Sequence, residues 1–503
     1  MFYCVNCFSN VNRRFWGRCY LLAASIIVIT PWYSSIAFAH AFGERYDLPL
    51  PISLYLSAAV SVVIFSFGLS AYFIRVSAID YSRHFTLLYW PGNLAFQKFG
   101  LLLIRCIGVA LFLLVLACGI WGQQDAFHNI APTFVWVIGW IGLVFIFALI
   151  GDFWPLINPW LSLAIFARWG CIRYLPKNIQ RQGSTWFENR GEASAWCCVI
   201  SLGVFFWLEL IWPYSEKPIN TAIILLIYSV YLWGGMLFFG IGNWLERGDL
   251  FTNIFGVFGR FSPLAVQSKT LRLRLPGSGL VTHQPASFAR SMFVIVLLAM
   301  VSFDGILETV WWQGVLQSIA QSQFLRPTLL SGQRYGVDLL MLIKTIAFVG
   351  FPLLLMAIFM LFCKFSSVVS GTKMPVMESV GHYVYALVPI ALAYHITHYA
   401  SYLLIAGQQM IPLGSDPFGF GWNLLNTQHY RLDLSIVNAK MIWILAIFSV
   451  VVGHVIAVIL AHVRALEIHQ NRSVALLSQL PMLMLMIAYT LLSLWILSQP
   501  LTT

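Results

Sequence analysis

Long apolar runs separated by short polar segments make up most of the chain. Each run is about 20 residues long, which is enough for a helix to cross the hydrocarbon core of a bilayer. The alternating segments of roughly ten residues that mark a transmembrane barrel are not seen. The pattern predicts an all-α fold, a polytopic transmembrane helical bundle. The ten expected spans are 52–74, 101–121, 133–151, 195–213, 219–243, 290–310, 338–363, 380–406, 438–464 and 478–498.

A further apolar stretch near the N-terminus has the features of a secretory signal. Three arginines precede an apolar core at 20–30, and Ala37-Phe38-Ala39 fits the small-residue cleavage pattern. We expect residues 1–39 to be a signal peptide that is removed, leaving 40–503 as a single integral membrane domain. The alternative is an uncleaved first span, because 39 residues is long for a signal.

The charged residues agree with a membrane location and indicate its orientation. Only 9% of the residues are charged, whereas a water-soluble domain carries about 25%. The net charge of +11 has a topological explanation, because eighteen Lys and Arg residues fall in the expected inner loops and five in the outer segments. This bias predicts a multi-pass membrane protein whose mature N-terminus lies on the outer side of the membrane. No nucleic-acid partner is needed to explain the basic excess.

Two inner loops, 152–194 and 244–290, are long but contain no separate soluble domain. The first begins with Gly151–Trp160, where two prolines break the helix, and continues as the amphipathic stretch 161–169, which is expected at the membrane interface. The second is expected to lie against lipid headgroups. Neither loop has a phosphate-binding or dinucleotide fingerprint. The nine cysteines show no disulfide spacing, so we expect free thiols.

Ionisable residues inside spans are the best functional candidates, because they are costly to place in a bilayer. His395 and His398 are three residues apart in one span, which puts their Cβ atoms about 5–6 Å apart on one helical face. Asp304 and Glu308 are four residues apart near the end of another span, and they also share a face. The expected topology places both pairs in the outer half of the membrane, and Glu209 approaches the same level.

The signal cleavage would add His40 to this set as the new N-terminus. An N-terminal histidine offers its α-amine and its imidazole together, a chelate that suits copper. Carboxylates and imidazoles together predict a divalent metal site for zinc, copper or manganese, with the identity left open. We expect His395, His398 and His40 as metal ligands, and Asp304 and Glu308 as catalytic groups, each a ligand or a general base. The same residues also fit a proton or ion path, or a structural network between helices.

Four stretches of the chain carry a family resemblance: His40–Pro51, Gly151–Trp160, Ser302–Gly305 and Tyr394–Tyr399. Their combination resembles bacterial polytopic membrane proteins named fenitrothion hydrolases, and the likeness runs along most of the mature chain. The resemblance implies hydrolysis of an organophosphorus triester at its aryl ester bond, which releases a nitrophenol and a dialkyl thiophosphate. It assigns no catalytic residue to this chain.

The leading hypothesis is therefore a membrane-bound hydrolase of organophosphorus esters such as fenitrothion, acting through a metal-activated water at the periplasmic side. A small lipophilic substrate would partition into the lipid bilayer and reach the site laterally. The alternative is a membrane metalloprotein without hydrolase activity, such as a copper-handling transporter or a copper-dependent oxidase, which His40 at the mature N-terminus would suit. Either function leaves room for a second subunit.

Overall fold

The computed structural model describes most of the expected membrane domain. The described residues are 51–74, 85–89, 94–170, 191–267, 270–282, 284–325, 327, 331, 338–469 and 471–499. Arg45–Thr503 form one compact unit. The expected signal peptide 1–39 and the candidate ligand His40 lie outside the described residues.

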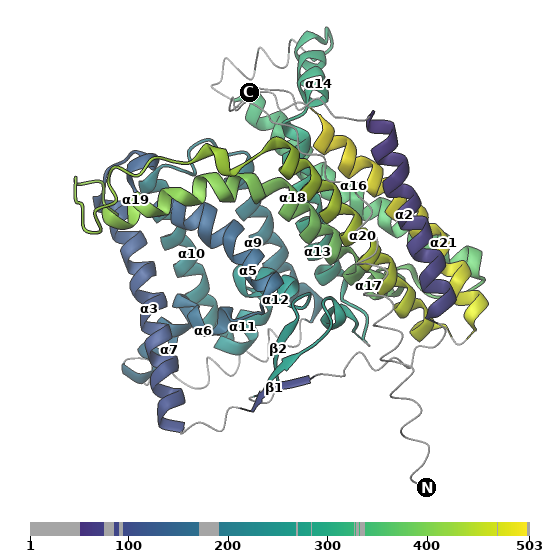
Figure 1. Cartoon of the computed structure of the whole chain (residues 1–503), viewed down its shortest axis with the longest axis horizontal. Helices are drawn as coiled ribbons and strands as arrows, with labels where there is room; N and C mark the ends of the chain where they lie inside the picture. Colours follow the sequence, from purple (N-terminus) through teal and green to yellow (C-terminus); the bar gives the residue numbers. More distant parts are fainter. Residues whose placement is uncertain are drawn as a thin grey trace. The chain divides into compact units, whose positions relative to one another are not determined.

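Ten helices in the described part of the chain are long and apolar enough to cross a membrane, which confirms the predicted all-α transmembrane fold (Figure 1). Two spans are built from several consecutive pieces. One consists of α4 (Ile130–Pro132), η2 (Thr133–Gly142) and α5 (Leu143–Leu149), and another of α17 (Val376–Tyr383), η5 (Val384–Leu387), α18 (Val388–Ala406), η6 (Gly407–Gln409) and α19 (Met410–Ser415). The others are α2 (Ile52–Phe73), α3 (Leu94–Trp121), α9 (Glu192–Leu210), α10 (Pro218–Phe239), α13 (Phe288–Leu307), α16 (Leu339–Ser370), α20 (Ala439–Ile468) and α21 (Arg472–Ser498).

The central helix of the bundle is α13, which is buried along nearly its whole length. Between Ser291 and Ser302 its sequence is apolar on every side, and a helix of this kind has no polar face to turn outward. It packs against α9, α16 and α18. Ser287 begins the helix, and its hydroxyl accepts a hydrogen bond from the Arg290 amide at 3.3 Å. The last turn of α13 therefore carries Asp304 within protein rather than within lipid.

A close contact between α18 and α20 fixes the level of two polar residues. A Cβ atom on Gly453 would lie 2.5 Å from Ala393 Cβ and 2.7 Å from the Pro389 carbonyl oxygen. Small residues at such contacts let helix backbones approach in a membrane, where van der Waals packing drives association. Tyr394 on α18 and His454 on α20 consequently lie at the same level of the bundle.

The third span contains a π-helical stretch, η2. Asn129 fixes the start of this span, because its Oδ1 accepts a hydrogen bond from the Ala131 amide at 2.9 Å. Its side-chain nitrogen donates to the carbonyls of Cys118 and Gln123, both at 2.8 Å. π-Helical turns widen a helix locally and are frequent at functional sites. Here η2 supplies part of the wall of the cavity described below.

The end of the bundle opposite to Asp304 is tied together by a small sheet of three strands, β1 (Phe85–Tyr89), β2 (Leu264–Gln267) and β3 (Thr270–Leu273). The central strand, β3, pairs antiparallel with both of the others. The segment before α3 and the segment that carries β2 and β3 therefore lie at one end of the bundle (Figure 1). The predicted topology places both segments in inner loops, so it requires them to lie at the same end of the bundle.

The 151–160 segment forms an elbow. Asp152 Oδ1 accepts a hydrogen bond from the Trp154 amide at 3.1 Å, where the short α6 (Trp154–Ile157) begins. Pro159 then starts α7 (Pro159–Gly170), because its fixed φ and missing amide proton suit the first turn of a helix.

The 244–290 segment departs from its expected place on the headgroups. After α11 (Ile241–Arg247), α12 (Leu250–Gly259) is buried against α5 and α9. Its apolar side chains cover several sides of the helix, and lipid headgroups could cover only one. Asp249 caps α12 and accepts hydrogen bonds from the hydroxyls of Thr252 at 2.5 Å and Tyr228 at 2.7 Å. Burial raises the pKa of the Asp249 carboxyl.

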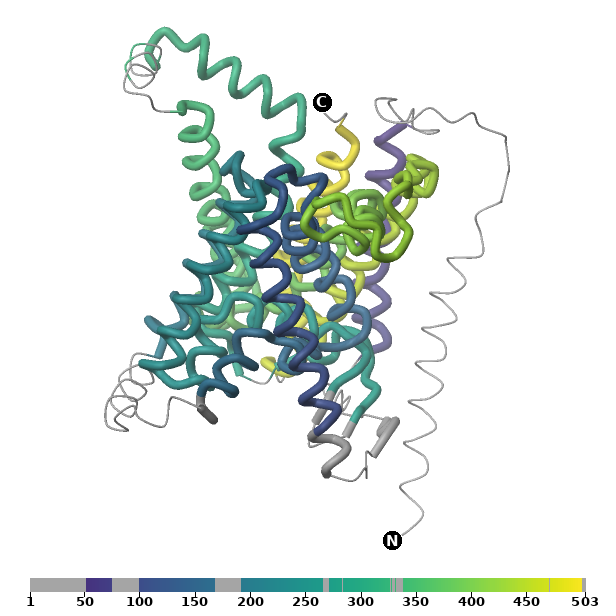
Figure 2. The backbone as a smooth tube through the Cα atoms, turned by 90° about the vertical axis from the view of Figure 1, so that its left-hand side faces the viewer, coloured from purple at the N-terminus to yellow at the C-terminus, as the bar shows by residue number. Residues whose placement is uncertain are grey.

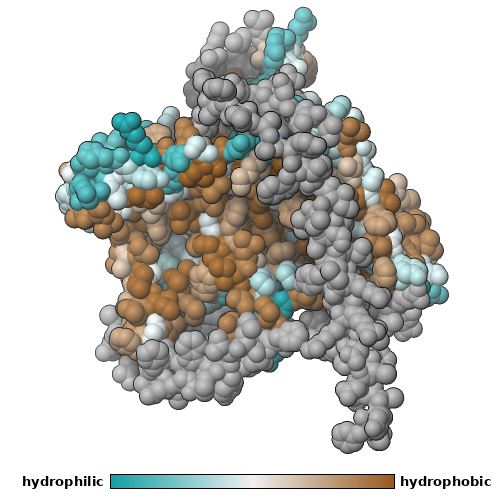
Figure 3. Space-filling view, viewed as in Figure 1, coloured by the Kyte–Doolittle hydropathy of each residue, from teal (hydrophilic) through white to brown (hydrophobic). Residues whose placement is uncertain are grey.

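The side of the bundle presents a broad apolar surface. On α10, Ile227 and Val230 are 66% and 71% exposed, and Figure 3 shows a wide hydrophobic face below the hydrophilic α19 region. Such a surface is suited to lipid chains. By contrast, α14 (Val310–Gln321) follows α13 and projects beyond the other helices (Figure 2).

Candidate metal centre

The end of α13 and the middle of α18 bring three potential ligands together. Asp304 lies in the last turn of α13, and Glu308 directly follows its end. His398 projects from α18. One ligand atom from each of the three residues lies within 4.8 Å of the other two. The structure thus unites Asp304, Glu308 and His398, three of the five residues that the sequence singled out.

Asp304 contacts two side chains of α18. Nε2 of His398 lies 2.8 Å from Asp304 Oδ2, and the hydroxyl of Tyr399 donates to the same oxygen at 2.8 Å. The side chains of Asp304 and His398 are only 19% and 13% exposed, so their contact is shielded from bulk water. Hydrogen bonds to a ligating carboxylate hold it in orientation. Tyr399 is positioned to do this for Asp304.

The three residues open into a cavity of about 540 Å³. Carboxylates line more than one side of it, because Glu209 of α9 and the exposed Glu216 also belong to its wall. Glu209 Oε2 is buried, and Trp140 is the side chain that hydrogen-bonds the Glu209 carboxyl. A buried carboxylate with a single neutral donor is costly, which favours a cationic or protonated partner in the cavity. Further wall residues are Trp136, Ile141, Thr397, Tyr402, Ile496 and Leu497.

The donor atoms fit a divalent metal ion. Two carboxylates and one imidazole form a three-residue set, which in catalytic zinc sites leaves the remaining coordination position for water or substrate. Oxygen and imidazole donors also suit manganese. Asp304, Glu308 and His398 would hold the ion at the wall of the cavity, with Glu209 belonging to the same wall.

His395 does not belong to this group. Its ring lies among aromatic rings, with centroids 4.9 Å from Tyr399 and 5.3 Å from Trp140. Its Nε2 lies 3.5 Å from the Ile141 carbonyl oxygen. Three residues turn an α-helix by about 300°, so the two imidazoles diverge by about 60°. His398 therefore meets α13, while His395 meets η2.

Other polar residues near this end of the bundle form separate local contacts. Nδ1 of His128 lies 2.7 Å from Asp125 Oδ2, and both side chains are largely exposed. The hydrogen bond from His128 lowers the pKa of Asp125. His429 contacts its neighbour Gln428 at 3.0 Å. Neither histidine joins the three-residue group.

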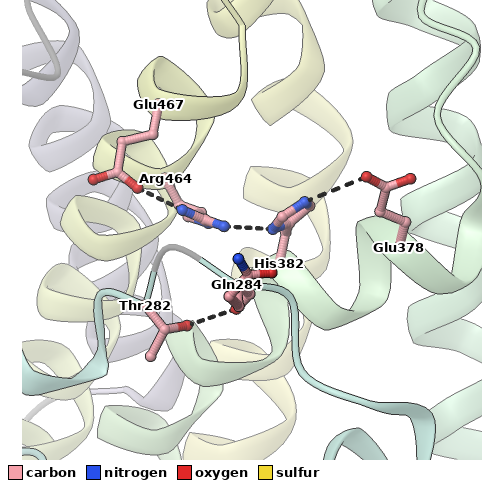
Figure 4. Close-up of polar contacts among 6 residues, drawn as sticks. All are labelled: Thr282, Gln284, Glu378, His382, Arg464 and Glu467. Carbon is pink, nitrogen blue, oxygen red and sulfur yellow. Dashed lines mark hydrogen bonds and ion pairs between the residues drawn. The ribbon is translucent and has the colours of Figure 1, made fainter.

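The opposite end of the bundle holds a second polar network, drawn in Figure 4. Arg464 donates to Glu467 Oε2 at 2.5 Å and to His382 Nδ1 at 2.6 Å. Nε2 of His382 then lies 3.8 Å from Glu378 Oε1. Because Nδ1 accepts from a guanidinium, His382 is neutral with its proton on Nε2. This network links α17 and α20, and we interpret it as a structural contact between these helices.

Two residues of the centre were not assigned as site residues from the sequence. The predicted topology placed Glu209 at the level of the other candidates, and it is the one acidic residue in its predicted span, but no role was assigned to it. Tyr399 carried little signal, because the chain contains 20 tyrosines and aromatic residues are common at the ends of spans. Comparisons of the chain with family models, with curated proteins and with solved structures find no match.

Proposed function

We propose that the protein is a metal-dependent membrane hydrolase that cleaves lipophilic organophosphorus esters in the cavity beside Asp304. The observation that carries the proposal is the convergence of Asp304, Glu308 and His398 within 4.8 Å of one another on the cavity wall. The resemblance to fenitrothion hydrolases supplies the substrate class. A divalent ion bound by these residues would supply a water of lowered pKa and would polarise the phosphorus centre.

The size and lining of the cavity support a small, largely apolar substrate. About 540 Å³ falls within the roughly 300–1,000 Å³ typical of small-molecule sites. Ile496 and Leu497 from α21 and Trp136 from η2 offer apolar contacts to an aromatic ester. A substrate dissolved in the bilayer could enter at this height of the bundle without crossing bulk water.

The remaining residues have distinct proposed roles. Tyr399 holds the Asp304 carboxylate in place through its 2.8 Å hydrogen bond. Glu209, a buried carboxylate on the cavity wall, is suited to take up the proton that water loses during hydrolysis. The charge bias of the loops supports a periplasmic location for this end of the bundle in a bacterial inner membrane.

The test uses the full chain, purified and inserted into nanodiscs. Metal content and nitrophenol release from fenitrothion are measured for the wild type, with and without a chelator, and for Asp304→Asn and His398→Gln. We expect the chelator and both substitutions to abolish nitrophenol release, with loss of bound metal. The matched control is Glu216→Gln, which changes an exposed carboxylate of the same cavity outside the three-residue group.

Two results would count against the proposal in different ways. Full nitrophenol release by metal-free protein would exclude a metal-dependent mechanism. Stoichiometric metal binding without any ester cleavage would support the alternative of a membrane metalloprotein that handles metal or uses it in redox chemistry.

A further inference from the structure

Beneath the candidate metal centre, four helices each contribute one buried polar side chain. These are Ser302 of α13, Tyr394 of α18, His454 of α20 and Tyr489 of α21, and we call them the inner polar cluster. They are 1%, 1%, 1% and 7% exposed, respectively. Each lies well inside its span. Burial of four polar groups together in a membrane calls for a functional explanation.

The hydrogen bonds within the inner polar cluster define which atoms are occupied. The Ser302 hydroxyl donates to the Leu298 carbonyl at 3.0 Å, so it accepts the hydrogen bond that joins it to the Tyr489 hydroxyl. The Tyr489 ring lies beside the His454 ring, with centroids 6.3 Å apart. Nδ1 of His454 lies 2.8 Å from the Val450 carbonyl oxygen. A carbonyl only accepts, so Nδ1 carries the proton and Nε2 presents a bare lone pair.

Three polar atoms around the Ser302–Tyr489 bond have no hydrogen-bond partner among the described residues. They are the hydroxyl of Tyr394, Nε2 of His454 and the hydroxyl of Ser493, one turn along α21 from Tyr489. Buried polar atoms in native proteins are nearly always satisfied by protein or by ordered water. Internal waters typically bridge two to four such atoms. This concentration of unsatisfied atoms therefore indicates bound water.

The inner polar cluster begins at the floor of the cavity. Gly305 lines the cavity, and a Cβ atom on it would lie 3.0 Å from the Tyr394 hydroxyl oxygen. Ser302 is three residues before Gly305, so the two share one face of α13. Tyr394 thus lies between the cavity and the Ser302–Tyr489 pair.

Towards the opposite end of the bundle, the polar groups are interrupted. The next ionisable residue of α20 is His462, eight residues or about 12 Å further along the helix. Buried Ala457 and Val458 lie between, and both nitrogens of His462 already contact partners, Gln479 at 2.8 Å and the Ile74 carbonyl at 3.1 Å.

Few titratable groups face His454 from the helices packed around it. Tyr394 of α18 and Tyr489 of α21 are its neighbours, while α2 contains no charged residue and no histidine. The titratable residues of α17 and η5 are the members of the network at the opposite end, together with Tyr383 and Tyr385. His454 is therefore the terminal imidazole of a path that starts at the cavity.

We infer that the inner polar cluster is a hydrated proton relay between the cavity and His454. A proton from cavity water passes by way of Tyr394 and the Ser302–Tyr489 pair and bonds to Nε2 of His454, which forms the imidazolium. Return of either ring proton along the same path restores the neutral ring. The relay goes beyond the proposed hydrolysis and operates whether or not an ester is cleaved.

Exchange of the His454 ring proton with water tests the relay directly. An imidazole N–H exchanges readily once a proton is delivered to the other ring nitrogen, so exchange at Nδ1 reports proton delivery to Nε2. The full chain is labelled with ¹⁵N-histidine in nanodiscs, and imidazole exchange is followed by NMR. The His454 signal is identified by its absence in His454→Gln.

His462 is the internal control, because it is equally buried and both of its ring nitrogens already contact protein partners. We expect exchange at His454 and protection at His462, with loss of the His454 exchange in Tyr394→Phe while the metal content stays unchanged. Protection of His454 equal to that of His462 would overturn the relay. Exchange that persists in Tyr394→Phe would overturn the route through Tyr394.

The thermal stability of Tyr394→Phe is measured to distinguish an effect on the relay from misfolding of the variant. Tyr394→Phe removes a hydroxyl that has no protein partner, so in a dry cluster the substitution raises the stability of the protein. In a hydrated cluster the hydroxyl is bonded to water, and its removal lowers the stability. Increased thermal stability of Tyr394→Phe would contradict the inference.

Discussion

Nε2 of His398 lies 2.8 Å from Oδ2 of Asp304, although the two residues are 94 positions apart in the sequence. A polar contact between membrane helices contributes only about 0.6 kcal/mol on average. An aspartate at the centre of a span costs about 2.5–3.5 kcal/mol to insert, and less towards the end of the helix. The contact therefore contributes less free energy than the insertion of the aspartate costs. This difference indicates that the pair serves a function and is not kept for stability.

Tyr399 is predicted to tune metal binding without being a ligand. Tyr399→Phe removes the hydroxyl that donates to Asp304 Oδ2 at 2.8 Å but keeps the ring. Loss of such an outer hydrogen bond typically weakens metal affinity by about 10–100-fold. Competition with a chelator of known affinity measures the change. Tyr402→Phe, on the same cavity wall, serves as the control, and equal affinities of the two variants would contradict the role of Tyr399.

The close contact at Gly453 is predicted to limit substitution there. Gly453→Ala would place a Cβ atom 2.5 Å from Ala393 Cβ, and overpacking of this kind costs about 1–3 kcal/mol. Gly350→Ala in α16 is the matched control, because a Cβ atom there meets nothing within 4 Å. Unfolding in mixed detergent should show a loss of stability in the first variant only. Equal stabilities would mean that α18 and α20 are less closely packed.

Asn129 is predicted to be a strong local anchor. Asn129→Ala removes one helix cap and two hydrogen bonds to the Cys118 and Gln123 carbonyls. A lost cap alone costs about 0.5–2 kcal/mol, and the two carbonyls are left without their donor. The comparison is Asn438→Ala, which removes a cap on α20 at an exposed position. The free energy of unfolding of the two variants is compared. A smaller loss of stability in Asn129→Ala than in Asn438→Ala would contradict the hydrogen bonds described for Asn129.

The Asp125–His128 pair predicts a defined pH dependence. Hydrogen bonding from His128 lowers the pKa of Asp125 in the folded protein. A carboxyl with a lowered folded-state pKa stabilises the protein above its unfolded-state pKa, and the contribution is lost as pH falls through the folded-state value. In His128→Ala the pKa of Asp125 should rise towards its ordinary value. Carboxyl NMR titration checks this, and an unchanged pKa would show that the hydrogen bond is not formed in solution.

The fold was largely predictable because each span is a local property of the sequence. A run of about 20 apolar residues specifies a membrane helix whatever its neighbours are. The end of α16 was placed early, at 363 instead of Ser370, because hydropathy falls at Lys364 while the helix continues to Gly371, whose φ of 68° ends it. The burial of α12 was missed because a short apolar helix looks alike whether protein or headgroups cover it.

The site was predictable only in part, because helix rotation decides which side chains meet. Spacing placed His395 and His398 close together, but their neighbours differ: one faces η2 and the other faces α13. Asp304 and Glu308 do lie together, as their spacing predicts, because both are at one helix end and line the same cavity. Glu209 lines the same cavity from another span. The sequence predicts the depth of Glu209 in the membrane, but it does not predict the rotation of the helix that turns Glu209 towards the cavity.

The position of Asp304 in the chain has a consequence for biosynthesis. Its partner His398 is made 94 residues later, which at ribosomal rates of roughly 5–20 residues per second is a delay of about 5–20 s. During this interval α13 enters the bilayer with an aspartate that has no partner. The helix must therefore be held at the translocon, or kept neutral by protonation, until α18 arrives.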